Sequence, residues 1–410
     1  MTELPDHEVP SFPMARECPM RPPAAYREIR EREPVTRVRM PDGQVAWLVT
    51  GHEQARRLLA DPRVSSDRLH PAFPGSLTAE QRTAAERVRR LSTRRSMIHL
   101  DGADHGAHRR FLTGEFSLRR IAALRPRMQE IVDRCVDDLL AAPRPSDLVE
   151  HVSQAVPSLV ICELLGVPYE RRHDFHAWAN RLISRTASAR ERTAASDALN
   201  ECLETLVTEK ERGEPADDLI GRLIARNRRT PVMTHDEIVG TAVMLLIAGH
   251  QTTANMISLG VVTLLANPEH KAQVTADPSV LPSAIEEMLR YFSVVENAPA
   301  RVATEDIEIG GVTIRKDEGI VVSGLAADWD EEVFAHPDRL DFRRGARNHV
   351  AFGYGVHQCL GQNLARVELE LVFETLLRRV PSLSLAVPAD ELRYKDDAGI
   401  YGIHQVPVRF

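Results

Sequence analysis

Cys359 carries the clearest chemical signal in the sequence, because it ends a stretch punctuated by glycines, FGYGVHQC, that begins at Phe352. The positive end of a helix favours an anion, so a cysteine at that position is expected to be a stabilised thiolate. Such a thiolate can act as a nucleophile, bind a metal or lie inert in the core. A helix beginning here is predicted by apolar residues at helical spacing: Leu360, Leu364, Val367 and Leu371.

The neighbours of Cys359 argue against an inert thiol. Phe352 offers a large apolar face beside the sulfur, and His357 places a polar group two residues away. The glycines of the stretch, and Gly361 after it, permit a close approach of the backbone or a positive φ, which has no obvious value in a simple core. No second cysteine stands at zinc-finger spacing, which argues against a structural zinc site.

The stretch resembles the haem-binding loop of the cytochrome P-450 family, F-G-x-G-x-H-x-C-x-G-x-x-x-A, and it matches every fixed position through Gly361 and Ala365. The resemblance implies that Cys359 is the axial thiolate ligand of the iron of haem b, iron protoporphyrin IX. It also places Phe352, His357 and Gly361 in the haem-binding set. In this family the thiolate pushes electron density onto the iron, which favours cleavage of the O–O bond.

His105 and Arg109 form a second candidate group. They are spaced i, i+4, so on a helix they share a face, and both can donate hydrogen bonds to a carboxylate. Two basic residues by themselves are more often a surface pair. The segment resembles the family's H-x-x-x-R(R), whose histidine and arginine hold haem propionates, and Arg301 matches a further arginine that pairs with a propionate.

A long central helix is predicted between Thr234 and Pro268. Thr234 and Glu237 form a capping box at its start, and Pro268 stops the pattern. The span is about thirty residues, or roughly 48 Å at the α-helical rise. Hydrophobic residues lie on nearly all of its faces, so we expect this helix to be buried.

The middle of this helix breaks the pattern with the sequence AGHQTT, which starts at Ala248. Gly249 is costly inside a helix, and the Thr252 hydroxyl can bond back to the Ala248 carbonyl and bend the helix. A simple packing kink would explain both features. However, the hexad resembles the family's oxygen-binding segment, A-G-x-[DE]-T-[TS], which implies that Thr252 hydrogen-bonds the bound oxygen within a catalytic segment that includes Ala248, Gly249 and Gln251.

Gln251 stands where the family usually has an acid. An amide cannot give and regain a proton as a carboxylate can, so the usual proton relay is in doubt. Water, His250 or the substrate can compensate. The alternative is a chemistry other than ordinary hydroxylation.

Glu287 and Arg290 share a helix face at i, i+3. Such a pair is usually a surface salt bridge that contributes about 0–1 kcal/mol. It resembles the family's E-x-x-R, which lies on a buried helix behind the haem and bonds the segment that leads to the cysteine. The resemblance therefore implies a structural role for the pair.

Two segments are candidates for the substrate pocket. Val294, Val295 and Asn297 precede the propionate arginine and are expected to line the pocket. Ile400 and Tyr401 lie in a turn near the end of the chain that is expected to reach back to the substrate.

An arginine-rich segment lies at residues 82–95. The favoured interpretation of this segment is a solvated helix face without a functional role. Because the equivalent region of the family covers the substrate pocket, these arginines could instead meet an acidic substrate or one carried on an acidic protein. The residues are Arg82, Arg87, Arg89, Arg90, Arg94 and Arg95.

Composition narrows the class of protein. The 410 residues include 43% hydrophobic ones, enough for a large core, and the net charge of −7 gives no general nucleic-acid signature. Five scattered cysteines suit a reducing, cytoplasmic location. Residues 1–23 look like an irregular lead-in, and the longest apolar stretch, residues 242–249, is too short to span a bilayer. We therefore expect no membrane association.

The start of the chain predicts a small β region. Residues 24–33 read as a helix, residues 36–40 and 44–49 as two strands around a turn, and residues 52–60 as a second helix. The resemblance covers nearly the whole chain. It implies a single domain over residues 1–410, mainly α with a smaller β region, in the cytochrome P-450 fold, a triangular prism with a long central helix over the haem.

The function implied is that of a soluble monooxygenase similar to actinobacterial members acting on secondary metabolites. It would insert one atom of O2 into a C–H or C=C bond of a large polyketide, peptide or terpenoid-like substrate, or of an acidic one. Electrons would come from ferredoxin and ferredoxin reductase, so NAD(P)H would serve only indirectly. One alternative, motivated by Gln251, is oxidative coupling or ring formation. Another is a haem-binding sensor or carrier without turnover, against which Thr252 argues.

Overall fold

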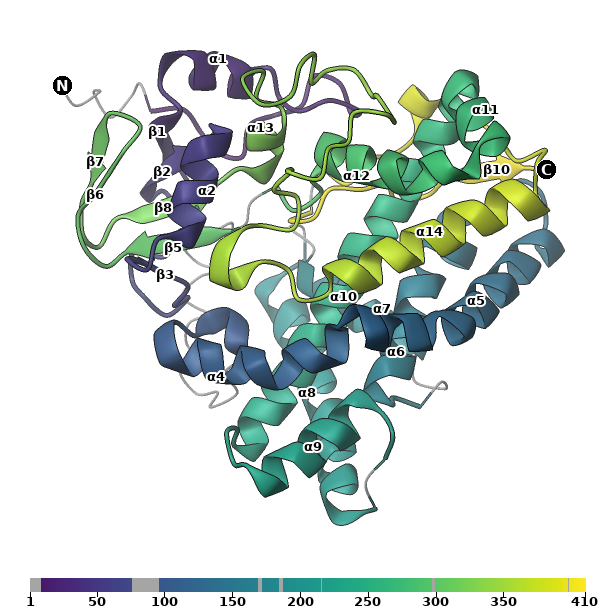
Figure 1. The fold of residues 1–410 in the computed structure, drawn as a ribbon, viewed down its shortest axis with the longest axis horizontal. Helices are drawn as coiled ribbons and strands as arrows, with labels where there is room; N and C mark the ends of the chain where they lie inside the picture. Colours follow the sequence, from purple (N-terminus) through teal and green to yellow (C-terminus); the bar gives the residue numbers. More distant parts are fainter. Residues whose placement is uncertain are drawn as a thin grey trace.

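The computed structural model describes residues 9–75, 96–168, 172–183, 187–214, 216–296, 299–396 and 398–410. Figure 1 shows a roughly triangular outline, with most strands gathered at one side and helices filling the rest. This confirms the expected architecture, mainly α with a smaller β region. The longer helices are α1 (Ala25–Arg32), α2 (His52–Ala60), α4 (Gly102–Thr113), α5 (Leu118–Ala141), α6 (Ala155–Leu165), α7 (Arg172–Ile183), α8 (Ala189–Arg212), α9 (Leu219–Arg229), α10 (His235–Ala266), α11 (Pro268–Ala276), α12 (Leu281–Phe292) and α14 (Gln362–Arg379), with the short α13 (Gly324–Asp328).

The largest sheet joins strands from the first 65 residues with strands from residues 300–322, in the order β1-β2-β8-β5-β3. β2 and β8 pair in parallel, with Trp47 opposite Ile320, and the other neighbours are antiparallel. Gly43 makes the turn between β1 and β2 at φ +85°, a conformation that glycine adopts without strain. The strands are β1 (Val35–Arg39), β2 (Val45–Val49), β3 (Val64–Ser65), β5 (Ala300–Ala303) and β8 (Gly319–Val322).

Two smaller sheets complete the β structure of the described residues. β4 (Ser146–Asp147), β10 (Pro407–Arg409) and β9 (Ser384–Leu385) pair in the order β4-β10-β9. β6 (Ile307–Ile309) and β7 (Val312–Ile314) form a hairpin. The predicted elements at the start of the chain are confirmed, with bounds shifted by no more than one residue.

Helix α10 is the central helix that the sequence predicts. It has 32 residues and begins at a capping box in which Thr234 and Glu237 exchange hydrogen bonds. It packs against α6, α8, α12 and α14, and most of its side chains are buried. The expectation of a buried helix without a polar face is therefore confirmed.

The lead-in has neither helix nor strand over residues 9–23, apart from one bridge between Ser11 and Arg39. The arginine-rich segment at residues 82–95 lies outside the described residues. Among the helices that are described, none combines the length and the apolar character needed to cross a membrane.

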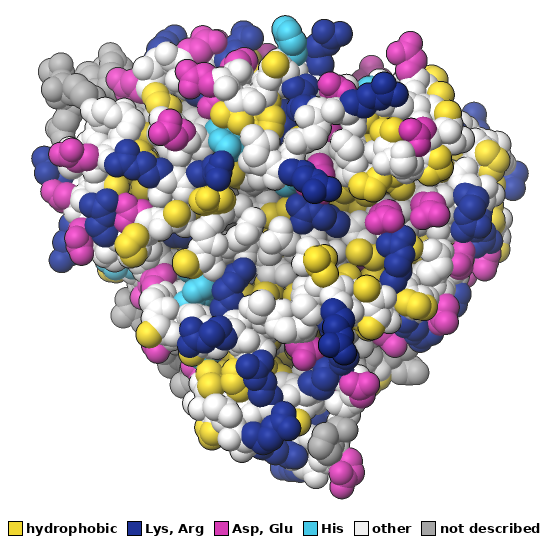
Figure 2. Space-filling view, viewed as in Figure 1, with side chains coloured by type: hydrophobic (Ala, Val, Ile, Leu, Met, Phe, Trp, Pro, Cys, Tyr) yellow, Lys and Arg dark blue, Asp and Glu magenta, His cyan; other side chains and the backbone are white. Residues whose placement is uncertain are grey.

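Charge is unevenly spread over the face shown in Figure 2. Lys and Arg side chains run down the middle of this face, whereas many acidic side chains lie toward its edges. The same face carries α4, α9 and α14 in Figure 1.

Candidate functional site

The loop before α14 presents Cys359. The Cys359 amide donates to the Phe352 carbonyl at 2.8 Å, which closes the loop, and Gly361 caps the helix that follows. Gly353 and Gly355 have φ of +68° and +74°. A Cβ on Gly355 would lie 2.3 Å from the carbonyl oxygen of Leu59 in α2. Glycine is therefore required here both by conformation and by close approach.

Part of the Cys359 side chain is accessible to solvent, although protein atoms surround the sulfur on most sides. Both statements hold for a side chain on the wall of an internal cavity. Burial raises the pKa of the thiol, although the backbone N–H groups of Gly361 and Gln362 and the charge of Arg109 act to lower it. The N–H groups at the helix start thus favour the anion as expected, although desolvation has the larger effect on the thiol.

Two buried donors near the loop have no protein acceptor. Among the described residues, His105 Nε2 and Arg301 Nε have no hydrogen-bond partner. Burial, with the charges of His357 and Arg109, lowers the pKa of His105 to about 4, and burial lowers that of Arg301 to about 10. A buried donor without an acceptor costs about 1–3 kcal/mol. These donors therefore fit a bound group that carries carboxylates, as a haem with its propionates does.

Arg109 and His357 also lie at the cysteine loop, but protein groups already engage them. Arg109 donates to the Gln358 carbonyl at 2.6 Å. The His357 ring lies 4.0 Å from the His105 ring, centroid to centroid, and its Nε2 is 3.0 Å from the Ser66 hydroxyl. The structure therefore brings the predicted propionate residues together around the residue before the cysteine.

Asp101 is a neighbour of this group that sequence reasoning missed. It accepts hydrogen bonds from the Ser65 hydroxyl at 2.5 Å and the Ser66 amide at 2.9 Å. Burial opposes its ionisation, but the hydrogen bonds from His357, Ser65 and Ser66 together lower the pKa of Asp101 to about 2. A permanent negative charge therefore stands beside His357.

On α10 the Thr252 hydroxyl donates to the Ala248 carbonyl at 2.8 Å, which confirms the predicted back-bond. Gln251 is fully buried, and Thr252 is partly exposed. A Cβ on Gly249 would lie 3.1 Å from Ile161 of α6, so glycine permits close packing of the two helices. The helix stays continuous through the hexad.

The Glu287–Arg290 pair is wholly buried, which excludes the ordinary surface salt bridge and agrees with the buried, structural pair that the family resemblance implies. Two hydrogen bonds of 2.9 Å join the side chains, and Arg290 also donates to the carbonyls of Asp328 and Pro337. Sequence reasoning missed Arg344, which donates to Glu287 at 3.0 Å. The segment leading to the cysteine loop is thus bonded to α12.

A second carboxylate of α12, Glu286, was also missed. Arg366 of α14 donates to it at 2.5 and 3.0 Å, and His349 Nε2 lies 3.2 Å from it. Burial alone would raise the pKa of Glu286, but the hydrogen bonds from His349 and Arg366 outweigh this and lower it to about 2. The Arg366 guanidinium also lies 4.5 Å from the Phe352 ring centre. Glu286 therefore holds both sides of the cysteine loop.

The predicted pocket residues are only partly brought together. Val294 is buried, and its carbonyl accepts the Tyr401 amide at 2.8 Å. Val295 is partly buried, and Asn297 lies outside the described residues. The Tyr401 hydroxyl donates to the Pro19 carbonyl at 2.6 Å, so this side chain faces the lead-in, which does not favour a direct contact with substrate.

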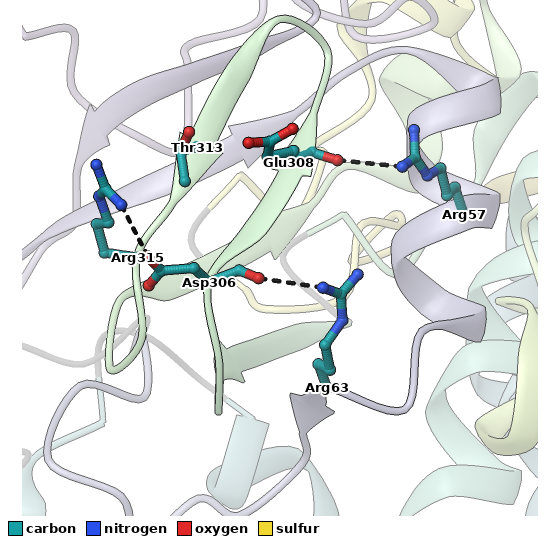
Figure 3. Close-up of a pocket in the computed structure, with 6 residues that line it drawn as sticks. All are labelled: Arg57, Arg63, Asp306, Glu308, Thr313 and Arg315. Carbon is teal, nitrogen blue, oxygen red and sulfur yellow. Dashed lines mark hydrogen bonds and ion pairs between the residues drawn. The ribbon is translucent and has the colours of Figure 1, made fainter.

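A separate pocket of about 510 Å³ lies at the β6–β7 hairpin. Figure 3 shows Arg57 and Arg63 reaching the backbone carbonyls of Glu308 and Asp306, and Arg315 reaching the Asp306 carboxylate. These contacts tie the hairpin to α2 and to the residues after it. None of the lining residues belongs to the predicted site.

A thiol on a glycine loop at a helix start, with buried unpaired nitrogen atoms of His105 and Arg301 near it, fits a cofactor that carries carboxylate groups. A sequence profile described as cytochrome P-450 matches residues 78–383. Pentalenic acid synthase of Streptomyces avermitilis is 46% identical over 398 residues, which is 97% of this chain and 96% of that protein. Vitamin D3 dihydroxylase of Streptomyces griseolus is 44% identical, over 98% and 97% of the two chains.

The crystal structure of cytochrome P-450 MoxA from Nonomuraea recticatena is 51% identical, with a TM-score of 0.90 and 98% of each chain covered. The chain belongs to the cytochrome P-450 family. It is an oxidoreductase, a monooxygenase of the type found in actinobacteria. Members of this family carry haem, use O2 and receive electrons from partner proteins.

Proposed function

We propose that residues 1–410 form a single cytoplasmic domain that binds haem b and inserts one atom of O2 into a C–H or C=C bond of a secondary metabolite. The observation that carries this proposal is that the unpaired buried nitrogen atoms of His105 and Arg301 lie near the loop that presents Cys359, with the His105 ring 4.0 Å from that of His357. Cys359 would be the iron ligand, and the charge of the iron would favour its thiolate over the thiol that burial otherwise favours. Bound haem supplies the binding and reductive activation of O2.

The propionates of the haem would be held from one side of the cysteine loop. His105 and Arg301 would donate their free N–H groups, and Arg109 and His357 would add charge-assisted hydrogen bonds. The loop would approach the haem ring closely at Phe352, Gly353 and Gly361. A Cβ placed on either glycine would have no protein atom within 4 Å.

Thr252 would handle protons on the α10 side. Its hydroxyl hydrogen is used in the bond to Ala248, so its oxygen lone pairs are free to hold a water. Gln251 can hold a water through its amide but cannot relay a proton as an acid would. Protons would therefore travel through water at Thr252, with Ala248 and Gly249 providing the room.

Ferredoxin, reduced by a ferredoxin reductase that draws on NAD(P)H, would supply the electrons. The basic middle of the face in Figure 2 supports this partner, because complementary charge steers an acidic electron carrier toward it. Arg226, Arg228 and Arg229 in the last turn of α9 and Arg110 in that of α4 contribute positive charge.

The substrate would meet Val294, Val295, Asn297 and Ile400. The two curated relatives are named for making pentalenic acid and for dihydroxylating vitamin D3. We therefore infer a substrate that is a medium-sized, largely apolar secondary metabolite.

The test is the carbon monoxide difference spectrum of the reduced protein, with Cys359→Ser as the control. The wild type should show the thiolate-type Soret shift, and the variant should lose it. A wild-type protein without this shift would overturn the assignment.

Oxidative coupling or ring formation is the second candidate, favoured by Gln251 in place of an acid. Mass spectrometry of the products distinguishes the two. Products that all gain a single oxygen atom would rule out the second candidate.

A further inference from the structure

We propose that residues 16–20 of the lead-in are part of the substrate site, with Arg16 as a positioning residue that fixes the two segments lining the pocket. This inference rests on the proposed function, since it takes residues 293–296 and the turn at Ile400 as walls of that pocket. Over residues 9–23 the lead-in has no helix or strand apart from the bridge of Ser11 to Arg39, so side-chain contacts help to hold residues 16–20 in place.

Arg16 joins the first wall through a shielded ion pair. Its Nη2 lies 3.3 Å from Glu296 Oε1, and the two side chains are only 8% and 11% exposed. Glu296 directly follows Val294 and Val295, so a fixed Glu296 fixes the end of this segment. Arg16 Nη1 also donates to the Arg21 carbonyl at 2.7 Å, which holds the lead-in in a turn.

Arg16 joins the second wall through Tyr401. Its guanidinium lies 3.8 Å from the centre of the Tyr401 ring, and the hydroxyl of that ring donates to the Pro19 carbonyl at 2.6 Å. Tyr401 stacks on Tyr394 at 6.0 Å, and the Tyr394 hydroxyl lies 3.3 Å from the sulfur of Met20. Residues 16–20 therefore cover the outer side of the C-terminal turn.

The inner side of the same turn contacts α10. Asn255, four residues after Gln251, donates to the Ile400 carbonyl at 3.3 Å, and the Lys395 ammonium donates to Asn255 Oδ1 at 2.9 Å. The turn thus lies between α10 and the lead-in. Because the Tyr401 amide donates to the Val294 carbonyl, the two walls are also bonded to each other.

Arg16 contacts both Glu296 and Tyr401. Removing Arg16 takes its positive charge away from a shielded carboxylate, which loosens the end of the segment at Glu296. The Val294–Val295 segment and the Tyr401 turn would then separate. A pocket with loose walls loses contacts to a bulky ligand but not to a small one.

Two azoles that bind haem iron serve as probes. Imidazole contacts little beyond the iron, whereas 4-phenylimidazole also reaches the pocket walls. Dissociation constants are measured from the Soret shift of the holoenzyme for wild type, Arg16→Met, Arg16→Lys and Glu296→Gln. Arg27→Met is the matched control, because Arg27 forms an exposed ion pair with Glu31 on α1.

Arg16→Met and Glu296→Gln should each weaken 4-phenylimidazole about tenfold relative to imidazole. The ratio of the two dissociation constants in Arg16→Lys should lie between the ratios of these variants and that of wild type. The ratio in Arg27→Met should match that of wild type. Hydrogen exchange of the Tyr401 amide should quicken in Arg16→Met. An unchanged ratio of the two dissociation constants in Arg16→Met, with the carbon monoxide spectrum intact, would overturn the inference.

Failure of the proposed function looks different. In that case the wild type itself would lack the thiolate-type carbon monoxide spectrum and would bind neither azole. A variant that unfolds is recognised from its thermal transition. If Arg16→Met unfolds, Arg16→Lys replaces it as the variant that tests the inference, because lysine keeps the charge but loses the planar stacking on Tyr401.

Discussion

The two sides of the site are held by different interactions. On the cysteine side, adjacent carboxylates of α12, Glu286 and Glu287, bind arginines and backbone amides around the loop. On the pocket side, the turn at Ile400 is held by single hydrogen bonds and stacked tyrosines, and the segment at Glu296 by an ion pair with Arg16. The thiolate must keep one geometry in every member of a family, whereas the pocket must differ from one substrate to the next. We therefore expect large effects from few residues on the first side and small effects from many residues on the second.

The largest effect should come from Glu287→Gln. It leaves Arg290 and Arg344 without their shared carboxylate in a fully buried place, at a cost of about 3–5 kcal/mol in the free energy of unfolding. Urea unfolding measures this cost. Glu31→Gln, which removes an exposed partner of Arg27, is the control and should change stability by less than about 0.5 kcal/mol. Equal effects of the two changes would refute the comparison.

Glu286→Gln should have the next largest effect, and it should depend on pH. The pKa of Glu286 is lowered from 4.5 to about 2, so its ionisation stabilises the fold above pH 4.5 by on the order of 3 kcal/mol. This stabilisation is lost as the pH falls from 4.5 toward 2. The gap in unfolding free energy between wild type and variant should therefore be full at pH 7 and narrower at pH 4. A gap independent of pH would contradict the ionised state of Glu286.

On the pocket side, Gly402→Ala should cost about 1–3 kcal/mol, because overpacking forces neighbours to move. The new Cβ would lie 2.2 Å from the side chain of Asn255. Gly399→Ala in the same turn is the matched control, since no atom lies within 4 Å of its Cβ. Thermal unfolding compares the two. Similar transitions would show that Asn255 does not hold the turn.

Thr252→Ala should change stability least, by about 0.5 kcal/mol or less, because a back-bond to the preceding turn adds little to a helix. It should nevertheless lower the product formed per electron consumed, with peroxide released instead. Thr263→Ala removes the same type of bond, to Leu259, from the same helix and should leave this ratio unchanged. A loss of coupling in both variants would mean that Thr252 acts through the helix alone.

A feature could be predicted from the sequence when the residues that form it lie close together in the chain. The capping box of α10, the turn at Gly43 and the cysteine loop depend on residues within about a dozen positions of one another, so their patterns are visible in the chain. The back-bond of Thr252 is equally local, and the structure confirms it.

The missed features join distant residues. Glu286 meets Arg366 and His349 only after the chain has folded, and nothing in their separate surroundings in the sequence marks them as partners. The position of Tyr401 in a turn was predicted, but the direction of its side chain was not. That direction depends on the lead-in, whose Pro19 carbonyl accepts the Tyr401 hydroxyl. The effect of burial on the pKa of Cys359 was also not visible in the sequence, since desolvation by the whole fold is not a local property.

The pairing of β2 with β8 has a consequence for how the protein is made. Val49 leaves the ribosome about 270 residues before Gly319, so at roughly 5–20 residues per second the first hairpin waits about 15–55 s for its central neighbour. Cys359 appears later still. During this interval the edge of β2 is open to other chains, so slower translation, a colder culture or an added chaperone should change the yield of active enzyme.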